Sequence, residues 1–301
     1  MVQSSGRRWT ATRPTGAILM YHRVCRTSND PWRLAVRPEH FEQHLALLAR
    51  EKVVPLTSLA CTPGGIAITF DDGYADNLET ALPLLEKYKL PATVFVATDA
   101  LRNREFWWDR VEHSLFESAT LPGARRRLRD MFTLQRFRTA ALGARLRTQG
   151  PEALEKSLSK LPHIRSAAEP ACSRHRMMSE DEVRVLAASP LIEIGAHTCS
   201  HPCLPQLPEQ EQQKEVTASR DILERLTGRR VRTFSYPYGA HDDTTVRVVK
   251  RAGFELACIV GGGQLRSSTD PLRMPRLMVR DFGGAAFAQY LRCWKTLRWL
   301  A

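Results

Sequence analysis

The chain has 301 residues, of which 43% are hydrophobic and 25% are charged, and its formal net charge is +12. These proportions are typical of a globular protein and exclude a disordered or collagen-like chain. No apolar run approaches the roughly 18 residues that a membrane-spanning helix needs, which excludes a protein that crosses the bilayer by helices. Seven cysteines without a C-x-x-C pair do not predict a disulfide scaffold.

The elements expected along the chain alternate between strands and helices. Continuous apolar runs predict strands over 17–21, 66–70 and 92–97, and helical spacing of apolar residues predicts helices over 38–50 and 78–89. A capping box at Ser179 and a stop at Gly228 mark later helices. The later elements are a helix over 179–188, a strand over 191–196, a helix over 209–226, a strand over 231–236, a helix over 244–252 and a strand over 255–260. This alternation is typical of an α/β fold with a parallel sheet.

Between the two alternating parts, residues from about 100 to 178 are rich in Arg, Leu and Ala, which predicts a mostly helical insertion. Within it, residues 123–165 hold nine Arg and two Lys against three acidic residues, a net charge of +8. A segment of this kind fits either an anionic partner or a solvated helical face. No nucleic-acid-binding module is visible, so we expect no specific nucleic-acid partner.

The two ends of the chain differ in character from the part between them. Residues 1–16 form a basic tail without the apolar segment of a secretory signal, so we expect a cytoplasmic protein. Residues 291–301 mix Trp, Leu and Arg, an amphipathic composition that suits peripheral contact with a membrane.

Polar side chains follow the predicted strands, where a parallel sheet places its chemistry. Asp71 and Asp72 follow the strand over 66–70, so one can bind a metal while the other acts as a base, although D-D-G is also common in turns. His197 and His201 follow the strand over 191–196 and can hold one divalent ion together with a carboxylate, although this spacing also arises by chance.

Two more strand ends and a second histidine pair carry similar alternatives. The turn around Tyr238 can aim a backbone N–H at an oxyanion or be a plain turn. His22 follows the strand over 17–21, in position for general acid catalysis or for a structural role. We interpret His40 and His44, on the helix over 38–50, as ordinary helix surface.

Taken together, three motifs resemble those of the polysaccharide deacetylase (NodB-homology) superfamily, carbohydrate esterase family four. They are Thr69-Phe70-Asp71-Asp72-Gly73, His197-Thr198-Cys199-Ser200-His201 and Tyr236-Pro237-Tyr238-Gly239. The resemblance covers roughly residues 17–100 and 179–280. It implies a distorted (β/α) barrel of about seven parallel strands within residues 17–290, and a divalent ion, first Zn²⁺ and otherwise Co²⁺ or Ni²⁺.

The resemblance also implies roles for individual residues. Asp72, His197 and His201 would hold the metal, Asp71 would be the general base, and the N–H of Tyr238 would help to hold the oxyanion. Most members carry the general acid in a late motif that this chain lacks. Residues 18–24 instead resemble the permuted branch of the family, typified by deacetylases of poly-N-acetylglucosamine, which makes His22 the expected acid.

Two further expectations concern the surroundings of the site. Ser235 stands where many members carry an Arg that orients the base, and we expect Arg276 to supply that guanidinium. Aromatic faces stack on sugar rings and carboxylates bind sugar hydroxyls, so the expected substrate contacts are Trp107, Trp108, Asp109 and Tyr236. The alternative for the tryptophan pair is a hydrophobic anchor that ties the insertion to the barrel.

The function implied is hydrolysis of an amide bond other than a peptide bond. The enzyme would remove N-acetyl groups from N-acetylhexosamine-containing glycans such as an exopolysaccharide, from glycolipids or from lipid-linked sugars. Two alternatives stay open: an O-acetyl polysaccharide esterase that uses the same site, and a carbohydrate-binding barrel without catalysis.

Overall fold

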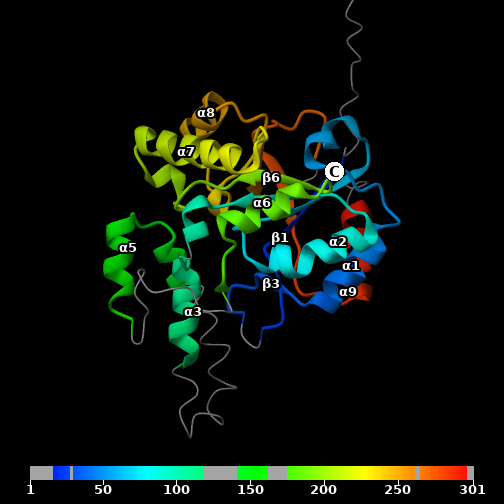
Figure 1. Cartoon of the computed structure of the whole chain (residues 1–301), viewed down its shortest axis with the longest axis horizontal. Coiled ribbons are helices and arrows are strands. Elements are labelled where there is room, and N and C mark those ends of the chain that lie inside the picture. Colours follow the sequence, from blue (N-terminus) through cyan, green and yellow to red (C-terminus); the bar gives the residue numbers. More distant parts are fainter. Residues whose placement is uncertain are drawn as a thin grey trace, which may run out of the picture.

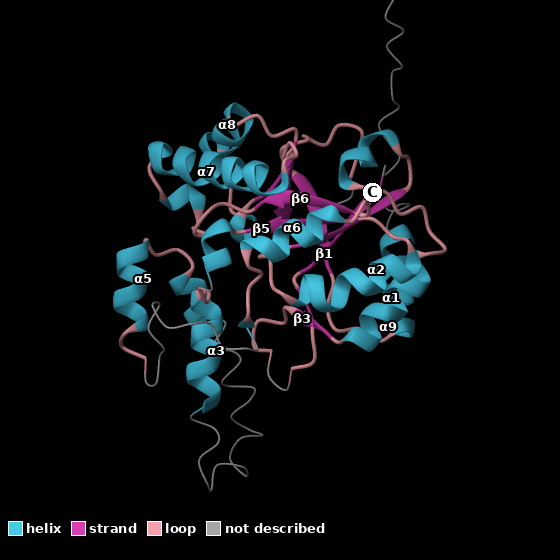
Figure 2. Ribbon diagram, viewed as in Figure 1, coloured by secondary structure: helices cyan, strands magenta, loops and turns pink. Residues whose placement is uncertain are grey.

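The computed structural model describes residues 16–27, 30–102, 104–117, 141–161, 175–261 and 265–296. Seven parallel strands close into a barrel in the order β1-β4-β5-β6-β7-β8-β9 (Figures 1 and 2). Pairing of the last strand with the first completes the closure. The expected distorted (β/α) barrel is therefore confirmed. The strands are β1 (Gly16–Tyr21), β4 (Gly65–Phe70), β5 (Ala92–Val96), β6 (Ile192–Ala196), β7 (Thr233–Ser235), β8 (Leu256–Val260) and β9 (Met274–Met278).

Helices surround the barrel and cover its apolar outer face. Figure 1 shows α1, α2 and α9 together on one side, with α7 and α8 packed against another. A two-stranded sheet of β2 (Arg23–Val24) and β3 (Ala35–Val36) lies apart from the barrel sheet. In the described part of the chain, no helix has the length and apolar character to cross a membrane. The helices are α1 (Pro38–Leu48), α2 (Leu82–Tyr88), α6 (Glu180–Ala188), α7 (Glu209–Thr227), α8 (Asp243–Arg251) and α9 (Gly284–Thr296).

Helix boundaries follow the expected signals, with differences of a few residues. Ser179 Oγ accepts from the backbone N–H of Glu182, whose carboxylate accepts in return from the N–H of Ser179, so the capping box is present. Helix α7 ends at Gly228, which has a φ of 64°. The helix expected over 78–89 begins as a π-helical turn at Asn77–Ala81 before α2.

Strand β9 is the barrel strand that the sequence did not predict. It is only five residues long and contains Pro275, which lacks the N–H that a strand interior normally contributes. The neighbouring strand nevertheless pairs with it in parallel register, Ile259 opposite Pro275 and Val260 opposite Arg276. A proline that argues against a strand thus lies in the strand that closes the barrel.

The interpretation of His44 as helix surface is wrong. Its ring is fully buried, stacks on Phe287 at a centroid distance of 3.9 Å, and places Nε2 2.7 Å from the carbonyl oxygen of Phe282. Burial lowers the pKa of His44 to about 4, so the ring is neutral near pH 7. His44 joins α1 to α9 rather than facing solvent.

The insertion lies to one side of the barrel, where Figure 1 shows α3 (Trp107–Glu117) beside α5 (Pro151–Leu158). These helices and residues 141–146 share a small core of Val111, Leu146 and Leu158. Much of the basic segment 123–165 lies outside the described residues. At the other end of the chain, Leu291 and Trp294 are buried in the main core, so these two side chains are not available to a membrane surface.

Gly195 on β6 has no room for a side chain. A Cβ there would lie 2.7 Å from Thr233 Oγ1 and still closer to the ring of Phe95, which packs 5.6 Å below the guanidinium of Arg276. We therefore expect Gly195→Ala to lower the free energy of unfolding by about 1–3 kcal/mol, measured by urea denaturation. Gly150→Ala, where nothing lies within 4 Å of the added Cβ, is the control. Equal stability of the two variants would contradict this account of the packing.

Candidate active site

Residues that follow four different strands meet in one cavity of about 390 Å³ at the carboxyl end of the barrel. His22 follows β1, the two aspartates follow β4, the two histidines follow β6, and Tyr238 follows β7. Because parallel strands all end at the same rim, residues distant in sequence are brought together there. The polar residues that line this cavity are His22, Asp71, Asp72, Arg147, His197, His201 and Tyr238.

Three of these side chains point their ligand atoms at one another. Asp72 Oδ1 lies 3.5 Å from Nε2 of His197 and 3.5 Å from Nε2 of His201, and the two Nε2 atoms are 3.1 Å apart. All three residues are buried. One carboxylate oxygen and two imidazole nitrogens at these separations form a ligand set for a single divalent ion, with open positions left for water or substrate.

The two imidazoles lie in different electrostatic environments. The Nδ1–H of His197 donates to the carbonyl oxygen of Ser235 at 2.7 Å, which leaves its Nε2 facing the other two ligand atoms. Burial lowers the pKa of His197, but the charges of Asp71 and Asp72 outweigh burial and raise it, so an ion that binds there displaces a proton from His197. Burial and the neighbouring His197 lower the pKa of His201 to about 3, so its ring is neutral near pH 7. Two deprotonated imidazole nitrogens with a carboxylate are donors that fit Zn²⁺, Co²⁺ or Ni²⁺.

The backbone around the ligands adopts conformations that non-glycine residues rarely take. Asp72, Thr198 and His201 have φ values of 76°, 65° and 60°. Each such residue costs of order 1–3 kcal/mol unless its surroundings hold it. Thr198 Oγ1 accepts from the N–H of His201 at 3.0 Å, and the carbonyl of Thr198 accepts from the N–H of Thr98 at 3.1 Å. These bonds hold the ligand loop in its strained form.

Two side chains that the sequence did not single out also hold the site. The carboxylate of Glu215, on α7, accepts from the backbone N–H groups of Cys199 and Ser200, both at 2.9 Å. Nδ2 of the buried Asn77 donates to the carbonyl oxygen of His22 at 2.9 Å. Glu215 is one of several charged residues on its helix, so its position in the sequence gives no signal of this role.

Asp71 has a different partner from its neighbour Asp72. The guanidinium of Arg276 donates to both of its carboxylate oxygens, at 2.7 and 2.6 Å, and both side chains are buried. Arg276 also donates to Ser235 Oγ at 2.8 Å and to Thr69 Oγ1 at 3.3 Å. Burial raises the pKa of Asp71, but the charge of Arg276 outweighs it and holds that pKa well below its ordinary range. Asp71 is therefore an ionised carboxylate of fixed orientation.

Aromatic side chains from the insertion form the walls of the site. Trp107 and Trp108 line the cavity, and Trp107 Nε1 donates to the hydroxyl oxygen of Tyr238 at 2.9 Å. Trp108 is 5% exposed and packs against Tyr74 and Met177, so it also anchors the insertion. The sugar-contact and anchor interpretations of Trp108 are thus compatible.

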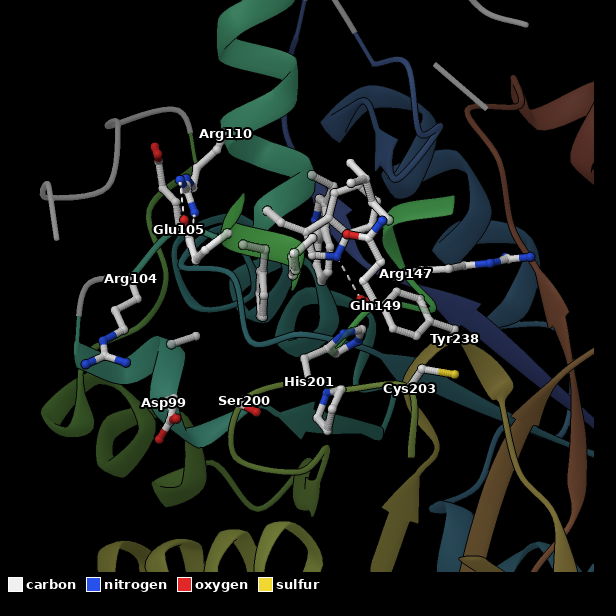
Figure 3. Close-up of a pocket in the computed structure, with 18 of the residues that line it drawn as sticks. Asp99, Arg104, Glu105, Arg110, Arg147, Gln149, Ser200, His201, Cys203 and Tyr238 are labelled. Carbon is white, nitrogen blue, oxygen red and sulfur yellow. Dashed lines mark hydrogen bonds and ion pairs between the residues drawn. The ribbon is translucent and has the colours of Figure 1, made fainter. Parts of the chain in front are cut away.

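A second cavity of about 250 Å³ shares Trp107, Trp108, Arg147, His201 and Tyr238 with the first. Figure 3 shows Arg147 and Tyr238 on one side of it, with Asp99 and Arg104 on the opposite side. His201 lies between aromatic rings there, at centroid distances of 4.6 Å from Tyr238 and 4.8 Å from Trp108. These rings shield His201 from solvent.

Two expected substrate contacts are not available. Tyr236 is fully buried against Phe234, and its hydroxyl donates to the carbonyl oxygen of Leu272 at 2.9 Å, so its ring faces the outer core. Asp109 is 2% exposed, accepts from the hydroxyl of Tyr74 at 2.8 Å and is not among the lining residues of the cavity. The structure does not place these two side chains where they contact the cavity, because neither is a lining residue.

Comparisons with known proteins identify the family of this chain. The family model for polysaccharide deacetylase matches residues 61–257, well over half of the chain. The chain therefore belongs to the polysaccharide deacetylase family. It is 22% identical over 289 residues to YxkH of Bacillus subtilis, whose name places it among the polysaccharide deacetylases, and the match covers 92% of this chain and 76% of that protein.

Solved structures share the fold. The deacetylase PplD of Streptococcus pyogenes matches with a TM-score of 0.62 and 18% identity, over 92% of this chain and 98% of PplD. A de-N-acetylase from Aggregatibacter actinomycetemcomitans matches with a TM-score of 0.60 and 16% identity, over 91% of this chain and 99% of that chain. At these identities the likeness shows the fold alone.

Arg276→Met should change the pH dependence of the site in a defined direction. Burial raises the pKa of Asp71, and the charge of Arg276 opposes that rise. Without the guanidinium, the pKa of Asp71 should therefore be higher. Asp71 can serve as a base only when ionised, so kcat/KM should fall about tenfold for each pH unit below the new pKa. We expect an acid limb at higher pH than in the wild type, measured as acetate release between pH 4 and 9. Arg273→Met, at a surface arginine of the same segment, is the control, and coincident profiles for both variants would contradict the role of Arg276.

Proposed function

We propose that this protein is a metal-dependent deacetylase that removes N-acetyl groups from N-acetylhexosamine residues of a glycan or glycolipid. The observation that carries the proposal is the division of labour between two adjacent carboxylates. Asp72 faces two imidazoles in a ligand set, whereas Asp71 faces the same cavity but is paired with Arg276. A hydrolase of this type needs both a metal site and a separate base.

Asp72, His197 and His201 would hold the ion. When bound, a divalent ion supplies polarisation of an acetyl carbonyl and acidification of a water molecule. Asp71 accepts the proton of the attacking water, and Arg276 keeps the carboxylate oriented toward it. Because Arg276 strongly disfavours protonated Asp71, the carboxylate does not retain that proton. The N–H of Tyr238 is the proposed donor to the developing oxyanion.

His22 is the proposed proton donor to the leaving amine. An amide nitrogen is a poor leaving group as an anion, so it must be protonated as the C–N bond breaks. Burial lowers the pKa of His22, although Asp72 and Asp71 oppose the shift, so the imidazole is neutral near pH 7. It must therefore gain a proton before it can donate one, and the proton released from the attacking water through Asp71 is a source in the same cavity.

The walls of the cavity support a sugar substrate. Trp32, Trp107, Trp108 and Tyr238 line it, and aromatic faces of this kind stack on sugar rings. The amide substrate is part of the proposal, and the His22→Ala experiment below tests it against an ester. An exopolysaccharide, a glycolipid or a lipid-linked sugar would each present the same N-acetylhexosamine group to this cavity.

The second candidate is an O-acetyl esterase that uses the same site. The neutral state of His22 favours it, because an alkoxide leaves more easily than an amine anion and needs less help from an acid. A carbohydrate-binding barrel without catalysis is favoured less, since Asp71 and Arg276 form a costly buried ion pair that sugar binding alone does not require.

Metal content and acetate release together test the proposal. We expect Asp71→Asn to retain the ion but to lower acetate release from N-acetylglucosamine oligomers by roughly 100-fold to 10,000-fold. His197→Ala should lose both the ion and the activity. His241→Ala is the control, because His241 bonds to the carbonyl of Gly239 and is not a lining residue of the cavity. Full acetate release by Asp71→Asn would contradict the assignment of the base.

His22→Ala separates the two candidate reactions. If His22 protonates an amine, the variant should lose activity on N-acetylglucosamine oligomers by roughly 100-fold or more, while an activated O-acetyl ester is still hydrolysed near the wild-type rate. The measurement is kcat/KM for the two substrates with both proteins. An equal loss on both substrates would show that His22 does not act as the acid for the leaving group.

A further inference from the structure

A second group of metal-ligating side chains lies in the insertion, apart from the site described above. Asp109 and Glu112 are one turn apart on α3, and His175 comes from the other end of the insertion. One ligand atom from each lies within 4.8 Å of the others. The three residues are 2%, 7% and 2% exposed, so all are withdrawn from water.

His175 is directed at the carboxylates but makes no close hydrogen bond. Its Nε2 lies 3.4 Å from Glu112 Oε1, which is longer than the 2.7–3.2 Å of a good N–H···O bond. Its Nδ1 is buried and has no hydrogen-bond partner among the described residues. A buried imidazole that the protein itself leaves poorly bonded is an available ligand.

The composition of this group also favours a cation. Two carboxylates lie beside a single imidazole, and all three side chains are buried. A buried carboxylate needs a positive charge or hydrogen bonds to replace its lost hydration. A divalent ion between the three ligand atoms would supply that charge.

We propose that Asp109, Glu112 and His175 form a second, structural cation site for a divalent first-row metal ion such as Zn²⁺ or Mn²⁺. Two carboxylates and one imidazole match these ions, whereas Mg²⁺ and Ca²⁺ prefer oxygen ligands alone. This site lies outside the lining of the catalytic cavity.

A cation here would join the two ends of the insertion beside the loop that carries Asp72. The segment that includes His175 bonds to that loop: the N–H of Ala75 donates to the carbonyl of Arg176 at 2.9 Å, and the N–H of Met178 donates to the carbonyl of Gly73 at 3.0 Å. Asp109 and Glu112, the other two ligands, lie on helix α3. The ion would thus fix the insertion against the catalytic loop.

The same group supports the wall of the active site. Asp109 accepts from the hydroxyl of Tyr74, whose oxygen in turn accepts from Nε1 of Trp108 at 2.8 Å. The ring of Trp108 packs against His201 at a centroid distance of 4.8 Å. Asp109, unavailable for sugar binding, is therefore a positioning residue for Trp108.

Counting bound ions tests the proposal independently of catalysis. The wild type and a His197→Ala/His201→Ala variant are freed of metal with a chelator, incubated with Zn²⁺ or Mn²⁺, desalted and measured by plasma mass spectrometry. We expect two ions per chain in the wild type and one in the variant without the catalytic ligands. Adding the isosteric Glu112→Gln to the His197→Ala/His201→Ala variant should remove the remaining ion. In that background, Zn²⁺ or Mn²⁺ should raise the melting temperature only when Glu112 is present.

Glu155→Gln is the matched control, because Glu155 lies in the same insertion but pairs with Arg110 outside the proposed ligand set. If the combined variant does not fold, Glu112→Gln in the otherwise wild-type chain should still lower the count from two to one. The wild type could also bind one ion only. If Glu112→Gln removes that ion and the His197→Ala/His201→Ala variant keeps it, the result would uphold this site and contradict the catalytic metal. A count that Glu112→Gln leaves unchanged in both backgrounds would overturn the second site.

Discussion

Arg276 and Asp71 form a bidentate ion pair inside the barrel, and the arrangement of the active site depends on it. Transferring each charge out of water carries a penalty of several kcal/mol, which only close pairing and further hydrogen bonds can offset. Arg276 supplies both, since it bonds to both oxygens of Asp71 and also to Ser235 and Thr69. With Asp71 held in this way, the adjacent Asp72 is the carboxylate that meets the two imidazoles.

This pair also makes the site dependent on the closure of the barrel. Arg276 lies on β9, the last strand, whose pairing with β1 completes the ring. Asp71 follows β4, and the ligand histidines follow β6, so the parts of the site arrive from strands spread around the barrel. The ring of Phe95 on β5 lies beneath the guanidinium, and Gly195 on β6 leaves room for that ring. The packing of the barrel interior therefore fixes the position of the Arg276 guanidinium, and with it the electrostatics of the site.

The sequence predicted those parts of the site that depend on strand ends, because apolar runs locate strands and parallel strands place their ends together. The convergence of Asp72 with His197 and His201 is of this kind. Arg276 was expected from the family resemblance instead, because Ser235 stands where many members carry an Arg that orients the base. Side-chain direction is a different matter. Tyr236 and Asp109 lie close to cavity residues in the sequence, but a turn and a helix rotate neighbours away from each other, and both residues are buried in the core.

Strand β9 was missed because Pro275 outweighs a short apolar run. The burial of His44 was missed because it depends on the segment around α9, about 240 residues away.

The central claim is that two adjacent carboxylates have separate tasks, one holding a metal and the other remaining a base. A crystal structure of the zinc-loaded protein, with anomalous diffraction measured at the zinc edge, tests it most directly. The account predicts an anomalous peak at about 2.0–2.2 Å from Asp72 Oδ1 and from Nε2 of His197 and His201, with both oxygens of Asp71 still bonded to Arg276. A peak coordinated by Asp71, with Arg276 displaced, or no peak between the three ligands, would contradict it.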